Sequence, residues 1–214
     1  MSAVDVADQV TELAEGPQSS EDDRKSRFQR QTALLIAVIA VLLAINSVGG
    51  GNAAEDALNN NILASDSWAF FQAKNVRQTV YKLAVDDLTM QLEFGGTTLP
   101  TAERQALQAR IAAYQATVDR YESEPDPNDS ADFLKGEGKR ELSQRALYHE
   151  ALRDEALARD GSFDIAEALF QIAIVLASVA ILATSRPARA LAILFALIAV
   201  GFMANGYLLL VELP

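Results

Sequence analysis

The chain has 214 residues, no cysteine and a formal net charge of −11. The absence of cysteine excludes disulfide bonds, thiolate metal sites and cysteine nucleophiles. The acidic balance argues against nucleic acid as a partner, because an acidic surface repels phosphate backbones and gains no counterion-release binding. Half of the residues are hydrophobic, and most of these lie in three runs, so composition points to a membrane protein with a polar insert.

Residues 1–31 are predicted to form a mobile polar head, because the segment is rich in acids, Ser and Gln and has little to bury. Val6, Val10 and Leu13 lie at helical spacing, so one short docking turn is the alternative. Residues 32–48 follow a basic cluster and are predicted to be transmembrane helix 1, at the short end of the spanning range. A cleaved signal peptide is the rival interpretation of this run, but the polar head is too long for an ordinary n-region.

Residues 49–162 are predicted to form an acidic helical extramembrane domain. The stretch 53–94 contains no Pro or Gly and predicts one long helix, which Gly95 and Gly96 end. Thr101 is the expected N-cap of a second helix that runs to about Tyr121. In the first helix, 53–94, the apolar residues that recur at helical spacing are Leu58, Ile62, Ala69, Val76, Val80 and Leu83. A third helix is predicted over 139–159, with Gly161 as a joint before the next span.

Helix lengths constrain how these three helices stand. At about 1.5 Å per residue the first helix would be about twice as long as either of the others. The chain leaves the membrane and must return to it, which is possible if the second and third helices run in series along the first. We therefore expect an elongated domain, unless Asn59, Asn60 and Asn61 break the first helix.

Residues 163–184 and 188–211 are predicted to be transmembrane helices 2 and 3, since both are almost purely apolar. Basic residues precede span one at Arg24, Lys25, Arg27 and Arg30, and Arg186 and Arg189 lie where span two connects to span three. Because basic residues stay on the cytoplasmic side, the N-terminus should be cytoplasmic and residues 49–162 extracytoplasmic. The predicted fold class is an all-α membrane protein with three transmembrane helices and an elongated helical domain between the first and second.

Three segments resemble a known family. They are Gly49-Gly50-Gly51-Asn52-Ala53-Ala54, the run Asp66-Ser67-Trp68-Ala69-Phe70-Phe71-Gln72-Ala73-Lys74-Asn75-Val76-Arg77, and Glu167-Ala168-Leu169-Phe170-Gln171-Ile172-Ala173. These are similar to uncharacterised bacterial membrane proteins grouped as domain of unknown function 4337. The resemblance covers most of the chain after the head. It implies a bacterial origin, the inner membrane and this arrangement of spans, and it assigns no activity and no site residues.

Polar residues inside the predicted spans are the best functional lead, because each is costly in hydrocarbon unless it has a partner or faces water. They are Asn46, Glu167, Gln171 and Asn205. We expect Glu167 to be satisfied by Gln171 and by Asn46 or Asn205 at a helix interface. The alternative is a vestibule that admits cations or protons.

A second candidate is an interaction face on the long helix. Its members are Trp68, Phe71, Gln72, Lys74, Asn75 and Arg77, which mix aromatic, polar and basic groups. The favoured interpretation is packing against a neighbouring helix. The alternative is a surface for a partner, since aromatic residues and Arg are common interface anchors.

The connector after the second helix carries a weak calcium-loop pattern. Asp126, Asn128, Ser130, Asp132 and Glu137 occupy ligand positions of such a loop. Ala131 stands where the pattern needs Gly, so we expect a polar connector, no metal and no other cofactor.

No motif indicates an enzyme. His149 is the sole histidine, and the chain has no Gly-x-Ser-x-Gly sequence, no phosphate-binding Gly-rich loop and no paired Glu-x-x-His. The predicted function is a non-enzymatic integral membrane scaffold or adaptor that self-associates and presents a helical stalk. Its partners would be membrane lipid, further copies or other membrane proteins. The alternative is a small oligomeric channel or transport accessory built around Glu167.

Overall fold

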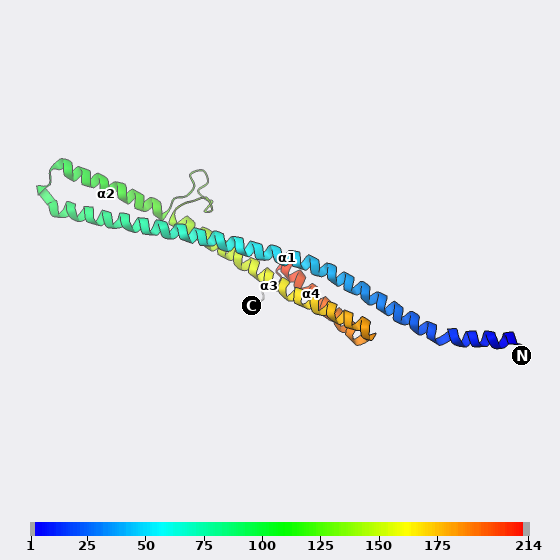
Figure 1. The fold of residues 1–214 in the computed structure, drawn as a ribbon. Coiled ribbons are helices and arrows are strands. Elements are labelled where there is room, and N and C mark those ends of the chain that lie inside the picture. The colour runs from blue at the N-terminus through cyan, green and yellow to red at the C-terminus, as the bar shows by residue number, and fades with distance from the viewer. Residues whose placement is uncertain (1–2, 212–214) are drawn as a thin grey trace. The chain divides into compact units, whose positions relative to one another are not determined.

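The computed structural model describes the backbone of residues 3–211 and the side chains of residues 21–211 except Thr97. This part of the chain forms four α-helices and one 3-10 turn and contains no β-strand, so the all-α prediction is confirmed. The elements are α1 (Ala3–Gly95), η1 (Gly96–Thr98), α2 (Thr101–Glu122), α3 (Lys139–Ala183) and α4 (Arg186–Leu208), as Figure 1 shows. The expected docking turn at Val6, Val10 and Leu13 lies outside the described side chains, and mobility of the head remains a prediction.

The chain divides into two compact units. Unit 1 contains Met1–Glu55 and Ala156–Pro214, and unit 2 contains Asp56–Glu155. Helices α1 and α3 each contribute to both units. Three helices, namely α1, α3 and α4, contain a stretch long and apolar enough to cross a membrane.

Helix α1 continues through Gly49–Gly51 and through Asn59–Asn61, so neither segment breaks it. It ends at Gly95, and Gly96 adopts a φ of 46°, a left-handed conformation that favours glycine. Leu99 folds back over Gly95, where a Cβ would overlap its side chain. The predicted end of the first helix is therefore correct to within one residue.

Two local predictions are wrong. The N-cap of α2 is Pro100, and Thr101 is the first helical residue, so Thr101 is not the N-cap. Helix α3 also passes through Gly161 without a joint. A single glycine lowers helix stability by only about 1 kcal/mol, which the apolar residues that follow and their packing outweigh.

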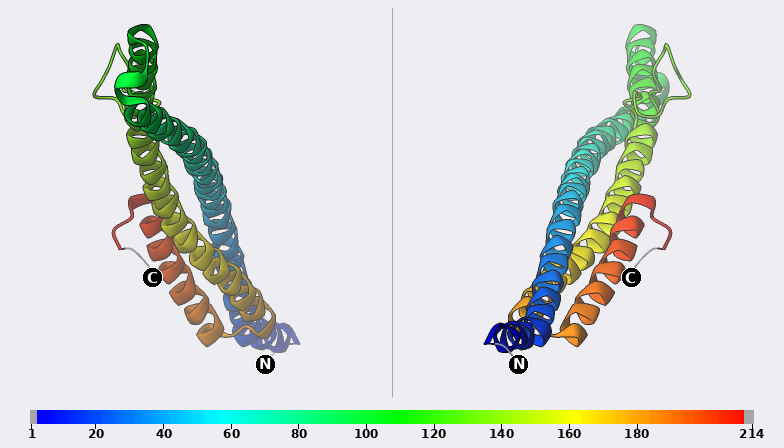
Figure 2. Two further views of the ribbon diagram at one scale, coloured as in Figure 1. Left: turned by 90° about the vertical axis from the view of Figure 1, so that its left-hand side faces the viewer. Right: turned by 90° about the vertical axis from the view of Figure 1, so that its right-hand side faces the viewer.

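The core of unit 1 lies between α1 and the hairpin of α3 and α4, which run side by side in both views of Figure 2. Small residues form most of it: Ala166, Ala173, Ala177 and Ala180 on α3, and Ala192, Ala196 and Ala199 on α4 are buried. Phe170 and Ile39 are the large side chains that fill the rest. Alanine at these positions allows the two helix backbones to approach closely.

Unit 2 is built on one face of α1. Two rows of residues at seven-residue spacing are buried or half-buried there: Ala57, Ala64, Phe71, Gln78, Val85 and Leu92, and Asn60, Ser67, Lys74, Tyr81 and Leu88. A seven-residue spacing keeps both rows facing a neighbouring helix. We call them the inner rows.

Helices α2 and α3 contact successive parts of these rows. On α2, the rings of Tyr114 and Tyr121 lie 5.3 and 6.0 Å from that of Tyr81. On α3, His149 Nδ1 lies 2.9 Å from Oδ1 of Asn60, and Glu150 accepts a hydrogen bond from the indole of Trp68 beside the row. Figure 1 shows α2 alongside the C-terminal part of α1. The two helices therefore follow one another along α1.

Candidate functional site

Asn46 is fully buried in unit 1, and it is tied to α3 by its side-chain amide. Its Nδ2 donates a hydrogen bond of 2.9 Å to the backbone carbonyl of Phe163, while its Oδ1 has no partner among the described residues. A buried amide in contact with a neighbouring helix backbone fixes the register of the two helices, because a shift by one residue would leave both its polar groups unpaired.

The ring of Phe163 is packed against glycines of two helices. A Cβ at Gly49 of α1 or at Gly206 of α4 would lie 2.8 Å from this ring. The Tyr207 ring meets it edge-on with centroids 4.9 Å apart, and the Tyr207 hydroxyl donates to the carbonyl of Ile45. Sequence reasoning missed this junction, although the glycine run 49–51 and the Gly206-Tyr207 pair are its signal.

Glu167 is half-buried and accepts two hydrogen bonds. Its Oε1 accepts from Gln171 at 3.2 Å and its Oε2 accepts from Ser47 at 3.3 Å. The expected Gln171 partner is present, but Ser47 takes the place of Asn46 or Asn205. Residues 46 and 47 are about 100° apart around α1, so Asn46 points into the helix interface while Ser47 lies at its rim beside Glu167.

Asn205 is satisfied near the end of α4. Its Nδ2 donates to Ser162 Oγ and to the carbonyl of Val211, and its Oδ1 accepts from the Val211 amide. Its backbone carbonyl accepts from Leu209, which adopts a left-handed φ of 47°. Of the four predicted intramembrane residues, the structure therefore brings only Glu167 and Gln171 into direct contact, and Asn46 and Asn205 bind neighbouring parts of α3.

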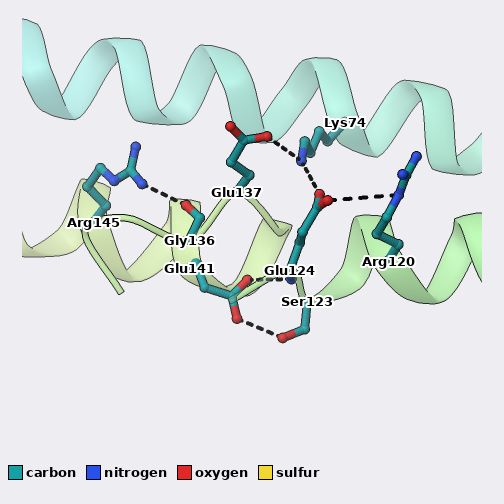
Figure 3. A network of polar contacts seen from close by, with 8 residues as sticks. All are labelled: Lys74, Arg120, Ser123, Glu124, Gly136, Glu137, Glu141 and Arg145. Atoms are coloured by element: carbon teal, nitrogen blue, oxygen red, sulfur yellow. Dashed lines mark hydrogen bonds and ion pairs between the residues drawn. The ribbon is translucent and has the colours of Figure 1, made fainter. Parts of the chain in front are cut away.

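A polar network closes the base of the loop between α2 and α3 in unit 2 (Figure 3). Glu141 accepts hydrogen bonds from Ser123 Oγ at 2.7 Å and from the Glu124 amide at 3.1 Å. Burial alone would raise the pKa of Glu141, but these hydrogen bonds outweigh it, so the pKa lies below its ordinary value. Gly138 is required here because a Cβ would overlap the Glu124 amide nitrogen.

Lys74 joins this network to α1. Its Nζ lies 3.0 Å from a carboxylate oxygen of Glu124 and 3.8 Å from one of Glu137, and Arg120 also pairs with Glu124 (Figure 3). Arg145 donates to the carbonyl of Gly136. These contacts hold both ends of the loop against α1.

Gln78 forms a second polar contact deep in the inner rows. Its Nε2 donates to the carbonyl of Val118 and to Glu122, and its Oε1 accepts from Lys139 Nζ. Hydrogen bonds from Gln78 and Lys139 lower the pKa of Glu122. One glutamine thus ties the end of α2 and the start of α3 to the same point of α1.

The predicted interaction face divides into two parts. Trp68, Phe71 and Lys74 are half-buried toward α2 and α3, while Gln72, Asn75 and Arg77 are exposed. Arg77 borders a cleft of about 350 Å³ that is also lined by Phe70, Ala73, Lys74, Glu137, Leu142 and Arg145. Trp68, Phe71 and Lys74 therefore pack within the unit, and Gln72, Asn75 and Arg77 face outward.

The calcium-loop residues do not converge. Asp126 accepts from the Asn128 amide, Asp132 from the Leu134 amide, and Lys135 pairs with Asp132 at 2.9 Å. Lys135 is the main cause of the lowered pKa of Asp132. Within the described residues there is no group of three or more His, Asp or Glu side chains able to hold a metal ion.

His149 has a structural contact. Its Nδ1 lies 2.9 Å from Asn60 Oδ1, which requires the ring to donate its proton there. Burial and the charge of Arg145 lower its pKa, so the ring is neutral at pH 7. It links α3 to α1 through an amide oxygen.

The described residues define a class of protein: an all-helical chain with three helices apolar enough to cross a membrane, in which a second helical unit contains α2 and the adjoining parts of α1 and α3. The model of the family described as "Domain of unknown function (DUF4337)" matches residues 28–209. The chain belongs to this family, as the three resembling segments predicted. A search of curated proteins and a search of solved structures each found no match.

Proposed function

We propose that the protein is a non-enzymatic scaffold or adaptor of the bacterial inner membrane, anchored by three transmembrane helices and self-associating. The observation that carries the proposal is the distribution of side chains in unit 1. Alanine fills the contact between α3 and α4, whereas large apolar residues such as Val175, Leu182 and Leu197 are 62%, 86% and 66% exposed. A soluble protein buries such residues, and a bilayer accommodates them facing outward.

The basic residues support the proposed orientation. Arg189, in the first turn of α4, lies over the Phe28 ring at 4.5 Å and donates to Gln31. The two basic segments, 24–30 and 186–189, are therefore at the same end of unit 1. That end would be cytoplasmic, which places the acidic residues 49–162 outside as an elongated stalk.

Unit 2 supports a binding role more than a chemical one. Its polar side chains at the loop base are paired with one another, and Lys74, Gln78 and Glu141 all join helices. The surface left for a partner includes Gln72, Asn75 and Arg77 and the cleft beside Arg77. An adaptor needs such a rigid, exposed helical surface and no reactive group.

The channel alternative depends on Glu167. Because Glu167 is half-buried and Gln171 is exposed, this pair lies at the edge of the three-helix contact and not along an axis within one chain. A conducting path would need several copies with Glu167 lining a shared centre. The scaffold proposal instead has Glu167 hydrogen-bonded at a helix interface, where it supports assembly.

Two substitutions distinguish these functions. Glu167→Gln keeps most of the hydrogen bonding to Ser47 and Gln171, so the scaffold proposal expects an unchanged oligomer. Glu167→Leu removes both contacts and should loosen or change the oligomer. The measurements are mass by size exclusion with light scattering in mild detergent, and cation flux in liposomes. If both variants assemble normally and either one loses a cation flux that the wild type shows, the channel function replaces the scaffold function.

A further inference from the structure

Helix α1 carries a third row of residues at seven-residue spacing, on the side opposite the inner rows. We call it the outer row; it consists of Ile62, Ala69, Val76, Leu83 and Met90. All five are exposed, and the four larger ones are 48%, 64%, 63% and 50% exposed. Each lies five residues after a member of the row that begins at Ala57, which places it about 140° from that member around the helix.

An apolar outer row is unexpected for a helix that packs on one side only. In a heptad whose first and fourth positions face a neighbour, the sixth position faces water and is ordinarily polar. Here the sixth position is apolar in five successive heptads. A row that repeats every seven residues stays in line only along a partner helix that supercoils with it, because a straight helix drifts about 20° per heptad.

We propose that the outer row is the seam at which α1 of a second copy of this chain packs, parallel and in register. This inference rests on the proposed membrane scaffold, since anchoring makes both copies leave the membrane at the same residue and so run in the same direction. The row from Ile62 to Met90 extends over about 42 Å of helix. That length is four heptads, which meets the three to four heptads that a coiled-coil seam requires.

The residues beside the outer row are compatible with a second copy. In a parallel pair, the residue four positions before an outer-row residue of one copy faces the residue one position after that outer-row residue in the other copy. The two facing residues are therefore five positions apart in the sequence. This pairs Leu58 with Leu63, Gln72 with Arg77, and Asp86 with Gln91 of the second copy. Leu58 and Leu63 are both exposed large apolar residues. These pairs are one apolar contact and two hydrogen bonds, with no pair of like charges.

Two aspartates oppose the same pairing. Asp66 and Asp87 follow Ile62 and Leu83 by four residues, at positions that face their own equivalents in a parallel pair. Two like charges across a seam weaken it. The seam would therefore hold copies together moderately within a membrane, where they are concentrated, and neutralising these two residues should strengthen it.

The test uses the full chain in mild detergent and in native membranes. Val76→Asp with Leu83→Asp places charges in the seam at residues that are 64% and 63% exposed within one chain, and should convert the wild-type oligomer to a smaller species. Asn75→Asp, compared with Val76→Asp alone, is the matched control, because Asn75 is exposed and off the seam and both changes add one negative charge. It should assemble like the wild type. Circular dichroism verifies that all variants stay helical.

Two further variants make the test specific to a second copy. Since the native chain has no cysteine, Val76→Cys should form a disulfide-linked dimer in membranes under mild oxidation, and Asn75→Cys should form far less. Asp66→Asn with Asp87→Asn should lower the dissociation constant several-fold. A seam that binds lipid or another protein would show neither effect.

The outcomes separate this inference from the proposed function. An oligomer that survives Val76→Asp with Leu83→Asp, combined with no cross-link at position 76, overturns the outer-row seam and leaves a scaffold that assembles elsewhere. A wild-type chain that is monomeric in detergent and uncross-linked in membranes overturns both the seam and self-association. Protection of a position-76 thiol by lipid vesicles without any cross-link would show that a membrane surface, and not a second copy, covers the outer row.

Discussion

The ring of Phe163 on α3 lies where the side chain of residue 206 on α4 would be if that residue were not glycine, since a Cβ there would come 2.8 Å from the ring. The same ring excludes a Cβ at Gly49 of α1. One aromatic side chain thus requires glycine on two different helices. This junction also holds Asn46, which donates to the Phe163 carbonyl, so it determines how the three helices of unit 1 meet.

The glycines at this junction should therefore be intolerant of a methyl group. We expect Gly206→Ala or Gly49→Ala to destabilise the protein by about 1–3 kcal/mol, because overpacking a filled contact displaces the ring. Gly51→Ala and Gly201→Ala are matched controls, since no described residue outside the local helix backbone lies within 4 Å of a Cβ at either site. Both should be neutral or more stable by about 0.5–1 kcal/mol from helix propensity. Thermal unfolding followed by circular dichroism in detergent measures the difference, and equal effects at all four glycines would contradict the assigned junction.

Glu141→Gln should destabilise unit 2 by about 1–3 kcal/mol at neutral pH, because it weakens the acceptor for Ser123 and the Glu124 amide. The folded-state pKa of Glu141 is lowered from the ordinary value of 4.5, so its stabilisation is present above that value and is lost as pH falls through the folded pKa. The gap between wild type and variant should accordingly close in acid.

The fluorescence of Trp68 reports this unfolding, since it is the sole tryptophan and lies in unit 2. Denaturant titrations at several pH values between neutrality and acid give the two stabilities. Glu137→Gln is the control, because Glu137 is exposed and its ion pair to Lys74 is long at 3.8 Å. A gap between wild type and Glu141→Gln that is constant with pH would show that the carboxylate charge is not what closes the loop.

The orientation in the membrane predicts which surface positions an impermeant maleimide reaches. Single cysteines at Ser26, Ser130 and Thr184 suit this test because all three side chains are exposed. Ser123 and Ser185 are less suitable, since they bond Glu141 and cap α4 respectively. In intact spheroplasts only the cysteine at position 130 should react, and all three should react after lysis. Labelling at positions 26 and 184 alone would invert the topology.

The loop between α2 and α3 should bind calcium no more tightly than a dissociation constant of about 10⁻⁴ M. Asp132 is paired with Lys135 and Glu137 with Lys74, so a cation would have to displace two lysines. Isothermal titration of the full-length protein with calcium measures this, with Glu137→Gln as the comparison. Submicromolar binding that the variant abolishes would restore the calcium-loop interpretation.

Helix formation and apolar character could be predicted from the sequence because both are local properties. The three apolar runs, the end of α1 near Gly95 and the break after α2 each depend on residues within a few turns. The predicted N-cap at Thr101 was wrong by one residue, because α2 begins at Thr101 itself and not at the residue after it. The joint predicted at Gly161 is absent because one glycine lowers helix stability only slightly when the residues before and after it in the sequence are packed.

Which side chains contact one another across helices was decided by the tertiary structure alone. Ser47 and not Asn46 meets Glu167 because a difference of one residue rotates a side chain by about 100°, and the position of the neighbouring helix selects between them. The apolar residues from Leu58 to Leu83 made the helix evident in the sequence, yet most of the larger ones are exposed, and the buried rows contain Asn60, Lys74 and Gln78. Periodicity predicts that a helix has faces; only the contacts of α2 and α3 determine which face is buried, because polar residues can be satisfied across a helix interface and apolar ones can be left for another partner.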